Sequence, residues 1–107
     1  MVKDIDASTL KKWIDTKKKI ILIDAGNPGD YHKGHIKGAI SLLLSDVDTQ
    51  AGKIIKSDIS VVVYSNDINC PASGLVSEKL DSLGYSPFYN YDPSFADWVN
   101  HNFPVVR

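Results

Sequence analysis

The sequence predicts an α/β protein with a central parallel sheet and helices on both of its faces. Two runs, at residues 20–23 and 59–64, are rich in β-branched residues and apolar at nearly every position, as strands buried on both faces are. Amphipathic segments with helical spacing alternate with such runs. Turn residues separate the segments, and no linker or repeat divides the chain, so we expect one domain covering residues 1–107.

The N-terminal part of the chain predicts a helix followed by a strand. Leu10, Trp13 and Ile14 recur at helical spacing and predict a helix over about residues 8–16. Three consecutive lysines follow it, and cations are favourable at a helix C-terminus. The strand at 20–23 comes next.

Weaker patterns lie between the two apolar strands. The string Asn27-Pro28-Gly29 predicts a turn. Residues 39–42 predict a second short strand. Residues 46–58 are polar around two isoleucines and predict no defined element.

The C-terminal half predicts two helices and a strand. Pro71 is a favourable first residue for a helix, and Gly84 is suited to end that helix in a left-handed conformation. Residues 88–91 predict a strand, and a last helix begins at residues 93–94. The apolar face of the helix after Pro71 is expected to comprise Leu75, Val76, Leu80 and Leu83.

The charge balance argues against several partners. The chain has 12 basic and 13 acidic residues and a net charge of −1, whereas a nucleic-acid binder usually carries a clear basic excess. No apolar run approaches the about 20 residues that cross a bilayer, and no segment resembles a secretion signal. We therefore expect a cytoplasmic protein with no nucleic-acid and no membrane partner. Arg107 is the only arginine, so we expect no site chemistry that needs a guanidinium group.

The chain has one cysteine, Cys70, which excludes an intramolecular disulfide and a four-cysteine metal site, and we expect no metal and no cofactor. Cys70 lies in the loop between the strand at 59–64 and the helix that Pro71 opens. Ligands of parallel sheets collect beyond the carboxyl ends of the strands, and a cysteine at a helix start can react as a thiolate. Position alone leaves two interpretations open: a nucleophilic or sulfur-carrying site, or a joining loop with Cys70 packed beneath it. The residues expected to bind an anion in this loop are Asn66, Asp67, Ile68, Asn69, Pro71 and Ala72.

Three stretches lie in the order and spacing of one family's signatures. The first runs from Asp24 to Gly-His-Ile-Lys-Gly-Ala at 34–39, the second is the strand 61–64, and the third is 95–98 followed by Phe-Pro-Val at 103–105. Together they resemble the rhodanese-like domains over nearly the whole chain. The resemblance implies a parallel sheet of about five strands flanked by helices. It also implies sulfane-sulfur transfer, in which a loop cysteine takes sulfur from thiosulfate or a persulfide and passes it to an acceptor.

The chain departs from this family at the position of the nucleophile. The family's catalytic cysteine directly follows the second signature strand, and this chain has Ser65 there. A serine hydroxyl cannot form a persulfide, and no neighbouring base is evident to activate it. Three interpretations stay open: the domain is inactive, sulfur moves to Cys70, or Ser65 replaces a natural cysteine in an engineered chain. The expected function is sulfur transfer or carriage at the loop 65–70. The alternative is an inactive module that binds a protein or a small anion through the same loop.

Other departures bear on the ligand. Thiosulfate is a dianion, yet the loop offers no lysine or arginine, and Asp67 would repel it. We therefore favour a small thiol, a polysulfide or a protein persulfide as sulfur donor and acceptor. Gly26 stands where the family often has arginine. Pro93 and Ser94 stand where it usually has two glycines, and they are expected to form, with Asp24, a wall of the pocket.

Two residues are interpreted as structural rather than catalytic. His35 lies between Gly34 and Gly38, and we expect its ring to fix this turn, because a catalytic base needs a positioned partner. Asp24 lies at a strand end, and we favour a turn cap or a lysine pair over a pocket carboxylate for it. A cysteine phosphatase is disfavoured as well, because it needs an arginine beside the anion and Arg107 lies far along the chain.

Overall fold

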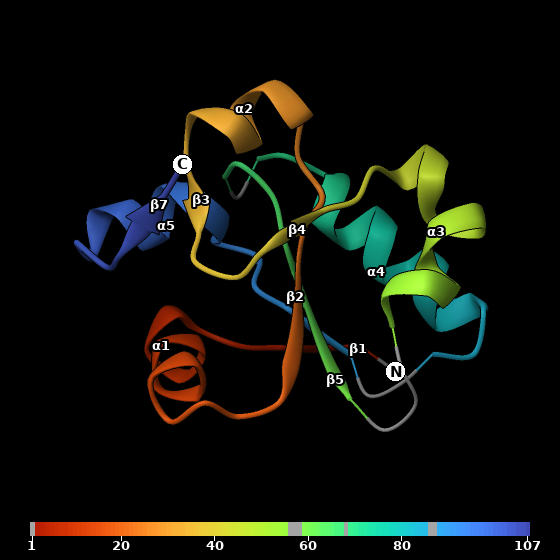
Figure 1. Cartoon of the computed structure of the whole chain (residues 1–107), viewed down its shortest axis with the longest axis horizontal. Helices are drawn as coiled ribbons and strands as arrows, with labels where there is room; N and C mark the ends of the chain where they lie inside the picture. Colours follow the sequence, from red (N-terminus) through yellow and green to blue (C-terminus); the bar gives the residue numbers. More distant parts are fainter. Residues whose placement is uncertain (1, 56–58, 68, 86–87) are drawn as a thin grey trace.

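The computed structural model describes residues 2–55, 59–67, 69–85 and 88–107. Its centre is the predicted parallel sheet, which in the described part of the chain has five strands in the order β1-β6-β5-β2-β4 (Figure 1). The predicted α/β class is therefore confirmed, as is the strand number that the family resemblance implies. Along the chain the strands are β1 (Val2–Asp4), β2 (Ile20–Asp24), β4 (Ile40–Ser41), β5 (Ser60–Tyr64) and β6 (Phe88–Asn90).

The two most apolar strands, β2 and β5, occupy the interior of the sheet. They pair in parallel over their full length, from Ile20 beside Ser60 to Asp24 beside Tyr64. Because parallel strands end at the same edge, the loops that follow Asp24 and Tyr64 leave the sheet side by side.

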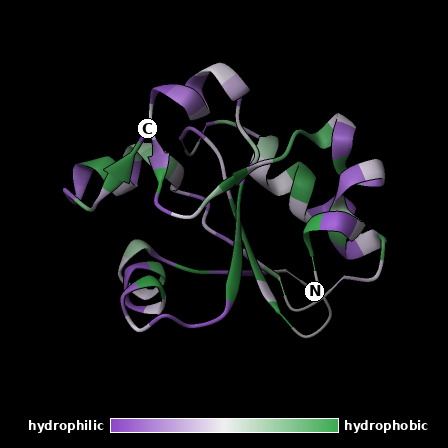
Figure 2. Ribbon diagram, viewed as in Figure 1, coloured by the Kyte–Doolittle hydropathy of each residue, from purple (hydrophilic) through white to green (hydrophobic). Residues whose placement is uncertain are grey.

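Helices cover both faces of the sheet, because alternate residues of each strand point to opposite sides. In β5, Val61 and Val63 pack into one core, and Val62 and Tyr64 pack into the other. Figure 2 shows the strands β2 and β5 as mostly hydrophobic, between helices that also carry hydrophilic segments. One face is covered by α1 (Ala7–Asp15) and α5 (Ser94–Asn100), and the other by α3 (Val47–Ile54) and α4 (Ala72–Ser82).

The string that predicts a turn instead begins a short helix, α2 (Pro28–Lys33). The Asn27 side chain accepts a hydrogen bond from the Gly29 amide at 2.7 Å, and Pro28 takes the first helical position. Asparagine and proline favour helix starts as well as turns, so the local pattern did not separate the two.

The segment 46–58, which predicted no element, contains α3, preceded by a 3-10 turn at Leu44–Asp46. Val47 and Ala51 are buried against the sheet and hold this helix in place. Residues 56–58 lie outside the described part of the chain.

The apolar face predicted for the helix after Pro71 was wrong in two of its four members. Leu75 and Leu83 are each 45% exposed. The buried positions of α4 are Ser73, Val76, Ser77 and Leu80, which recur at the spacing of one helix face. Two serines therefore lie on the buried face of α4, while two leucines that hydropathy assigned to that face are exposed.

Two short strands outside the main sheet hold the C-terminal segment. β3 (His35–Ile36) pairs antiparallel with β7 (Val105–Val106), which sets Ile36 beside Val105. The contact at Gly34 is close, because a Cβ there would lie 3.3 Å from Val105 Cγ1 and would require a small shift of that side chain. The pairing carries the last residue, Arg107, back over the carboxyl edge of the sheet (Figure 1).

The Ser77→Ala substitution is expected to raise the free energy of unfolding by about 1 kcal/mol. The Ser77 hydroxyl is buried and has no hydrogen-bond partner among the described residues, so alanine removes an uncompensated polar group. Urea unfolding followed by circular dichroism measures the change. Ser82→Ala, at an exposed position of the same helix whose hydroxyl bonds to the Lys79 carbonyl, is the control. A loss of stability in Ser77→Ala would contradict the expectation.

Candidate functional site

The candidate site begins where β5 ends, at Ser65. The residue is fully buried. Its amide donates to Ser94 Oγ at 3.1 Å, and its carbonyl accepts from the Phe95 amide at 3.0 Å. The Ser65 hydroxyl lies 3.4 Å from the Cys70 carbonyl oxygen and 3.4 Å from Ser94 Oγ. Ser65, for which the resemblance predicts the nucleophile position, is thus enclosed between the loop and the start of α5.

The rest of the loop is organised around Asp67. Its carboxylate accepts from the Asn69 amide at 2.9 Å, and its carbonyl accepts from the Cys70 amide at 3.1 Å. These two amides are therefore already bonded within the loop. Cys70 is partly exposed, and Pro71 and Ala72 lead from it into α4. Ile68 lies outside the described residues.

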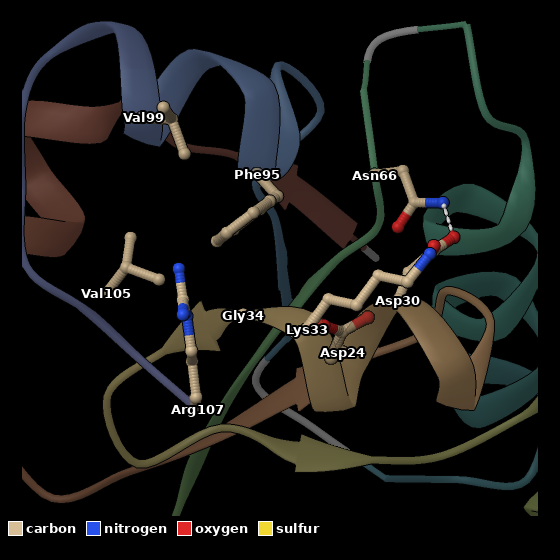
Figure 3. Close-up of a pocket in the computed structure, with 9 residues that line it drawn as sticks. All are labelled: Asp24, Asp30, Lys33, Gly34, Asn66, Phe95, Val99, Val105 and Arg107. Atoms are coloured by element: carbon tan, nitrogen blue, oxygen red, sulfur yellow. Dashed lines mark hydrogen bonds between the residues drawn. The ribbon is translucent and has the colours of Figure 1, made fainter.

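A pocket of about 560 Å³ opens beside this loop, at the carboxyl edge of β2 and β5 (Figure 3). Asn66 is the loop residue that lines it, and the other lining residues come from the end of β2, from α2, from α5 and from the C-terminal segment. The full lining is Asp24, Asp30, Lys33, Gly34, Asn66, Phe95, Val99, Val105 and Arg107.

Asp24 is the buried carboxylate of the pocket, with 4% of its surface exposed. Burial raises the pKa of Asp24 above its usual value, because the charged form loses hydration. Hydrogen bonds from the Gly26 amide, at 2.9 Å, and from the Tyr64 hydroxyl oppose this rise. The Tyr64 oxygen also accepts from the Ile36 amide at 3.1 Å, and burial raises the pKa of Tyr64 too.

Gly26 leaves room for the side chain of Asn66. A Cβ at position 26 would lie 2.6 Å from Asn66 Oδ1, so any larger residue there requires Asn66 to move. In its present position Asn66 donates from Nδ2 to the Asp30 carboxylate at 3.0 Å (Figure 3). The small size of Gly26 thus permits a polar link between the loop and α2.

The cations of the pocket come from segments that the sequence analysis did not connect with the loop. Lys33 lies at the end of α2, and the β3–β7 pairing brings Arg107 to the same cavity. Arg107 is distant from the loop along the chain, but the β3–β7 pairing brings it to a pocket that Asn66 also lines. Cys70 does not line this pocket, so the expectation that the chemistry of the loop needs no guanidinium group stays a prediction.

The remaining sequence-predicted residues lie around the pocket rather than in it. Ser94 is buried at a φ of 65°, and its hydroxyl bonds to the Tyr91 and Asp92 carbonyls. Neither Ser94 nor Pro93 lines the pocket. His35 is buried, with Nδ1 2.8 Å from the Tyr31 carbonyl and its ring stacked on Tyr31 at 3.8 Å between centroids.

The described part of the chain contains no group of three His, Cys, Asp or Glu side chains arranged to hold a metal ion. None of its helices has both the length and the apolarity that spanning a membrane requires.

The chain and its fold match a family of known proteins. The model of the rhodanese-like domain matches residues 6–101, so the chain belongs to the rhodanese-like family. This membership makes it a sulfur-transfer-related domain.

Two relatives and one solved structure are similar to the chain. The chain is 21% identical over 99 residues to "Putative sulfur carrier protein YrkF" of Bacillus subtilis, covering 92% of this chain and 51% of the relative. It is 28% identical over 96 residues to the Escherichia coli protein YibN, covering 85% and 64%. The chain thus spans between half and two thirds of these relatives. A rhodanese-related protein of Thermoplasma volcanium has the same fold, with a TM-score of 0.81, 24% identity and 97% coverage of both chains.

Sequence reasoning missed most of the pocket lining. Phe95 and Val105 belong to the closing signature, which indicates the family but does not predict a cavity. Apart from their charge, Arg107 and Lys33 show no sequence feature that predicts a place in the pocket. The antiparallel pairing of two-residue strands has no sequence signature strong enough to predict it.

Asp24→Asn is expected to stabilise the protein relative to the unaltered chain, and to do so more at neutral pH than in acid. Because the pKa of Asp24 in the folded state is raised above the ordinary 3.8, the protonated carboxyl contributes to the free energy of unfolding. This contribution is complete below pH 3.8 and is lost as the pH rises through the folded-state pKa. Asparagine at this position does not titrate, so the variant does not lose stability in this way. Urea unfolding of both proteins from acid to neutral pH measures the difference in their free energies of unfolding. Asp46→Asn, at an exposed position, is the control. A difference between Asp24→Asn and the unaltered chain that becomes smaller as pH rises would refute the expectation.

Proposed function

We propose that this rhodanese-like domain carries sulfane sulfur on Cys70 and that residue 65 takes no covalent part. One contrast supports the proposal most directly: Cys70 is partly exposed, whereas the Ser65 hydroxyl is fully buried and held by Cys70 and Ser94. Cys70 is also the only thiol of the chain. The group that accepts sulfur must be accessible to the sulfur donor. Of Cys70 and Ser65, only Cys70 is exposed to solvent in part.

The proposed chemistry moves one sulfur atom without net oxidation. The Cys70 thiolate attacks the outer sulfur of a donor persulfide, an S–S bond forms on Cys70, and the donor leaves as its thiolate. An acceptor thiolate then attacks the outer sulfur of the Cys70 persulfide, and Cys70 leaves as the thiolate with which it began. Each step forms one S–S bond and breaks one, so no further oxidant or reductant is needed.

The surroundings of Cys70 suit an anionic intermediate. Cys70 lies two residues before the first residue of α4, an eleven-residue helix. The N-terminal end of a helix favours negative charge, and the persulfide of Cys70 would be negative. In this proposal the domain acts in the cytoplasm, within one folded unit covering residues 1–107, with a small thiol, a polysulfide or a protein persulfide as donor and acceptor.

A second candidate function is a non-catalytic module that binds a protein or a small anion through the same loop. The enclosed serine at the family's nucleophile position favours this candidate, because it removes the usual persulfide site. The two candidates differ in whether the unaltered chain takes up sulfur.

Intact mass after incubation with polysulfide tests the proposal. We expect the unaltered chain to gain the mass of one sulfur atom, which cyanide removes as thiocyanate, and we expect Cys70→Ala to gain none. Ser65→Ala is the matched variant and should load as the unaltered chain does, because residue 65 makes no covalent bond.

Loss of loading in Ser65→Ala, with the fold intact by circular dichroism, would refute the role given to Cys70 alone. No gain on the unaltered chain, but a gain on Ser65→Cys, would support the binding module. Such a result would mean that the site lacks only its usual nucleophile.

A further inference from the structure

A second cavity lies between the end of α1 and the turn that follows β3 (Figure 1). Its volume of about 510 Å³ lies within the roughly 300–1,000 Å³ of pockets that hold organic groups. The second cavity shares no lining residue with the pocket beside the loop, and neither Ser65 nor Cys70 lines it. The proposed sulfur transfer therefore does not account for it.

One part of the second cavity is apolar. Its residues come from α1, β3, α5 and the C-terminal segment: Ile14, Ile36, Trp98 and Pro104. The polar atom of the Trp98 side chain, Nε1, already donates to the Pro104 carbonyl at 2.9 Å. A hydrocarbon group therefore suits this part of the cavity better than a polar one, which would lose hydration without gaining a hydrogen bond there.

The charged part of the second cavity is positive. Lys11 is paired with Asp15, so these two charges offset each other. Lys17 and Lys37 also line the cavity, and both are exposed. Neither forms an ion pair with any residue in the described part of the chain. The cavity thus has two uncompensated positive charges in addition to its apolar part.

The backbone at Lys17 favours a different residue type. In the described part of the chain, α1, α4 and α5 end in the same motif, in which one residue has a positive φ and the next amide donates to the carbonyl five residues earlier. The residue with positive φ is Gly84 after α4, Asn102 after α5 and Lys17 after α1. Glycine adopts this conformation freely and asparagine tolerates it, whereas lysine is disfavoured. Lys17 therefore lowers stability, and no ion pair of its ammonium group within the described residues compensates for this.

Positive charge continues beyond the second cavity. Lys18 and Lys19 directly follow Lys17 and are exposed. A small anion held in the cavity would leave these two charges unmatched, whereas a longer acidic chain would extend toward them. Nucleic acid would match the charges, but its phosphates would not use the apolar part. An acidic peptide segment with a hydrophobic side chain matches both features.

We propose that the second cavity is a docking site for an acidic segment of a partner protein. A hydrophobic side chain of that segment contacts Ile14 and Pro104, and carboxylates on either side of it meet Lys17 and Lys37. Because charge pairs at exposed positions are weak and are screened by salt, this docking is reversible and weakens as the salt concentration rises.

Three synthetic peptides, each blocked at both ends, test the proposal. The first is Asp-Glu-Phe-Glu-Asp, the second has alanine in place of phenylalanine, and the third is the uncharged Asn-Gln-Phe-Gln-Asn. We expect the first peptide to shift the backbone amide resonances of Lys17, Lys37 and Gly38. It should bind roughly tenfold more tightly than either of the others, since each of those lacks one kind of contact. Raising the salt concentration from about 50 to about 500 mM should weaken its binding.

The variant Lys17→Gly is expected to have opposite effects on stability and on docking. Glycine relieves the positive φ, so the midpoint of urea unfolding should rise. Loss of the ammonium group should weaken binding of the first peptide by roughly three- to tenfold. A variant that is more stable than the unaltered chain cannot lose binding by unfolding. Lys37→Gln should weaken binding by a similar factor.

Lys53→Gln is the matched control, because Lys53 is an exposed lysine of α3 that does not line the second cavity. It should leave binding of the first peptide unchanged. Equal binding of the three peptides, no shift at the cavity residues, or the same loss in Lys17→Gly and Lys53→Gln would overturn the proposal. Tighter binding of oligothymidylate or of phosphatidylglycerol vesicles than of the first peptide would overturn it as well.

Loading of Cys70 by polysulfide is measured on the same proteins. It should be the same in Lys17→Gly as in the unaltered chain, because the docking site and the loop share no residue. A chain that binds the first peptide but never loads Cys70 would refute the proposed function alone. A chain that loads Cys70 but does not bind the peptide would refute the docking site alone.

Discussion

The parallel pairing of β2 with β5 is the interaction on which the rest of this structure depends. It fixes five consecutive residue pairs and ends with Asp24 beside Tyr64. The β2–β5 ladder continues beyond the strands, since the Ala25 amide donates to the Tyr64 carbonyl at 2.8 Å. On the other side of β2, the pairing with β4 is extended by the Leu42 amide, which donates to the Asp24 carbonyl at 2.9 Å. A shift of this register would separate the buried carboxylate from the tyrosine and displace the loop that follows β5.

The same pairing divides the molecule into an apolar body and a polar edge. The strands pack hydrophobic side chains on both faces, and five residues of β2 and β5 are fully buried there: Ile23, Val61, Val62, Val63 and Tyr64. Beyond the strand ends, the buried polar groups of Asp24, Ser65 and Ser94 all have hydrogen-bond partners. Burial of a polar group without a hydrogen bond costs free energy, so these bonds favour a single arrangement of the edge on the body beneath it.

Local patterns in the sequence were sufficient for the body and insufficient for the edge. The β-branched runs predicted β2 and β5, and helical spacing placed α1 within one residue of its limits. Leu75 was placed in the core because hydropathy ranks leucine above serine, whereas the phase of α4 is set by the sheet it covers. The place of Arg107 beside the pocket could not be predicted in this way. It depends on a strand pair between segments about 70 residues apart, an interaction that no local pattern encodes. The loop itself was located from the order of strand, loop and helix.

The contact between Ser65 and Ser94 links two positions that lie 29 residues apart. A C–S bond is longer than a C–O bond, so a thiol at 65 would press on the hydroxyl that now lies 3.4 Å away. Glycine at 94 would remove that hydroxyl, and its freedom at positive φ suits the backbone there. The sizes of these two residues are therefore expected to vary together across related chains, with a larger atom on one side matched by a smaller residue on the other. A substitution at position 65 is therefore expected to be accompanied by a substitution at position 94, at the start of α5.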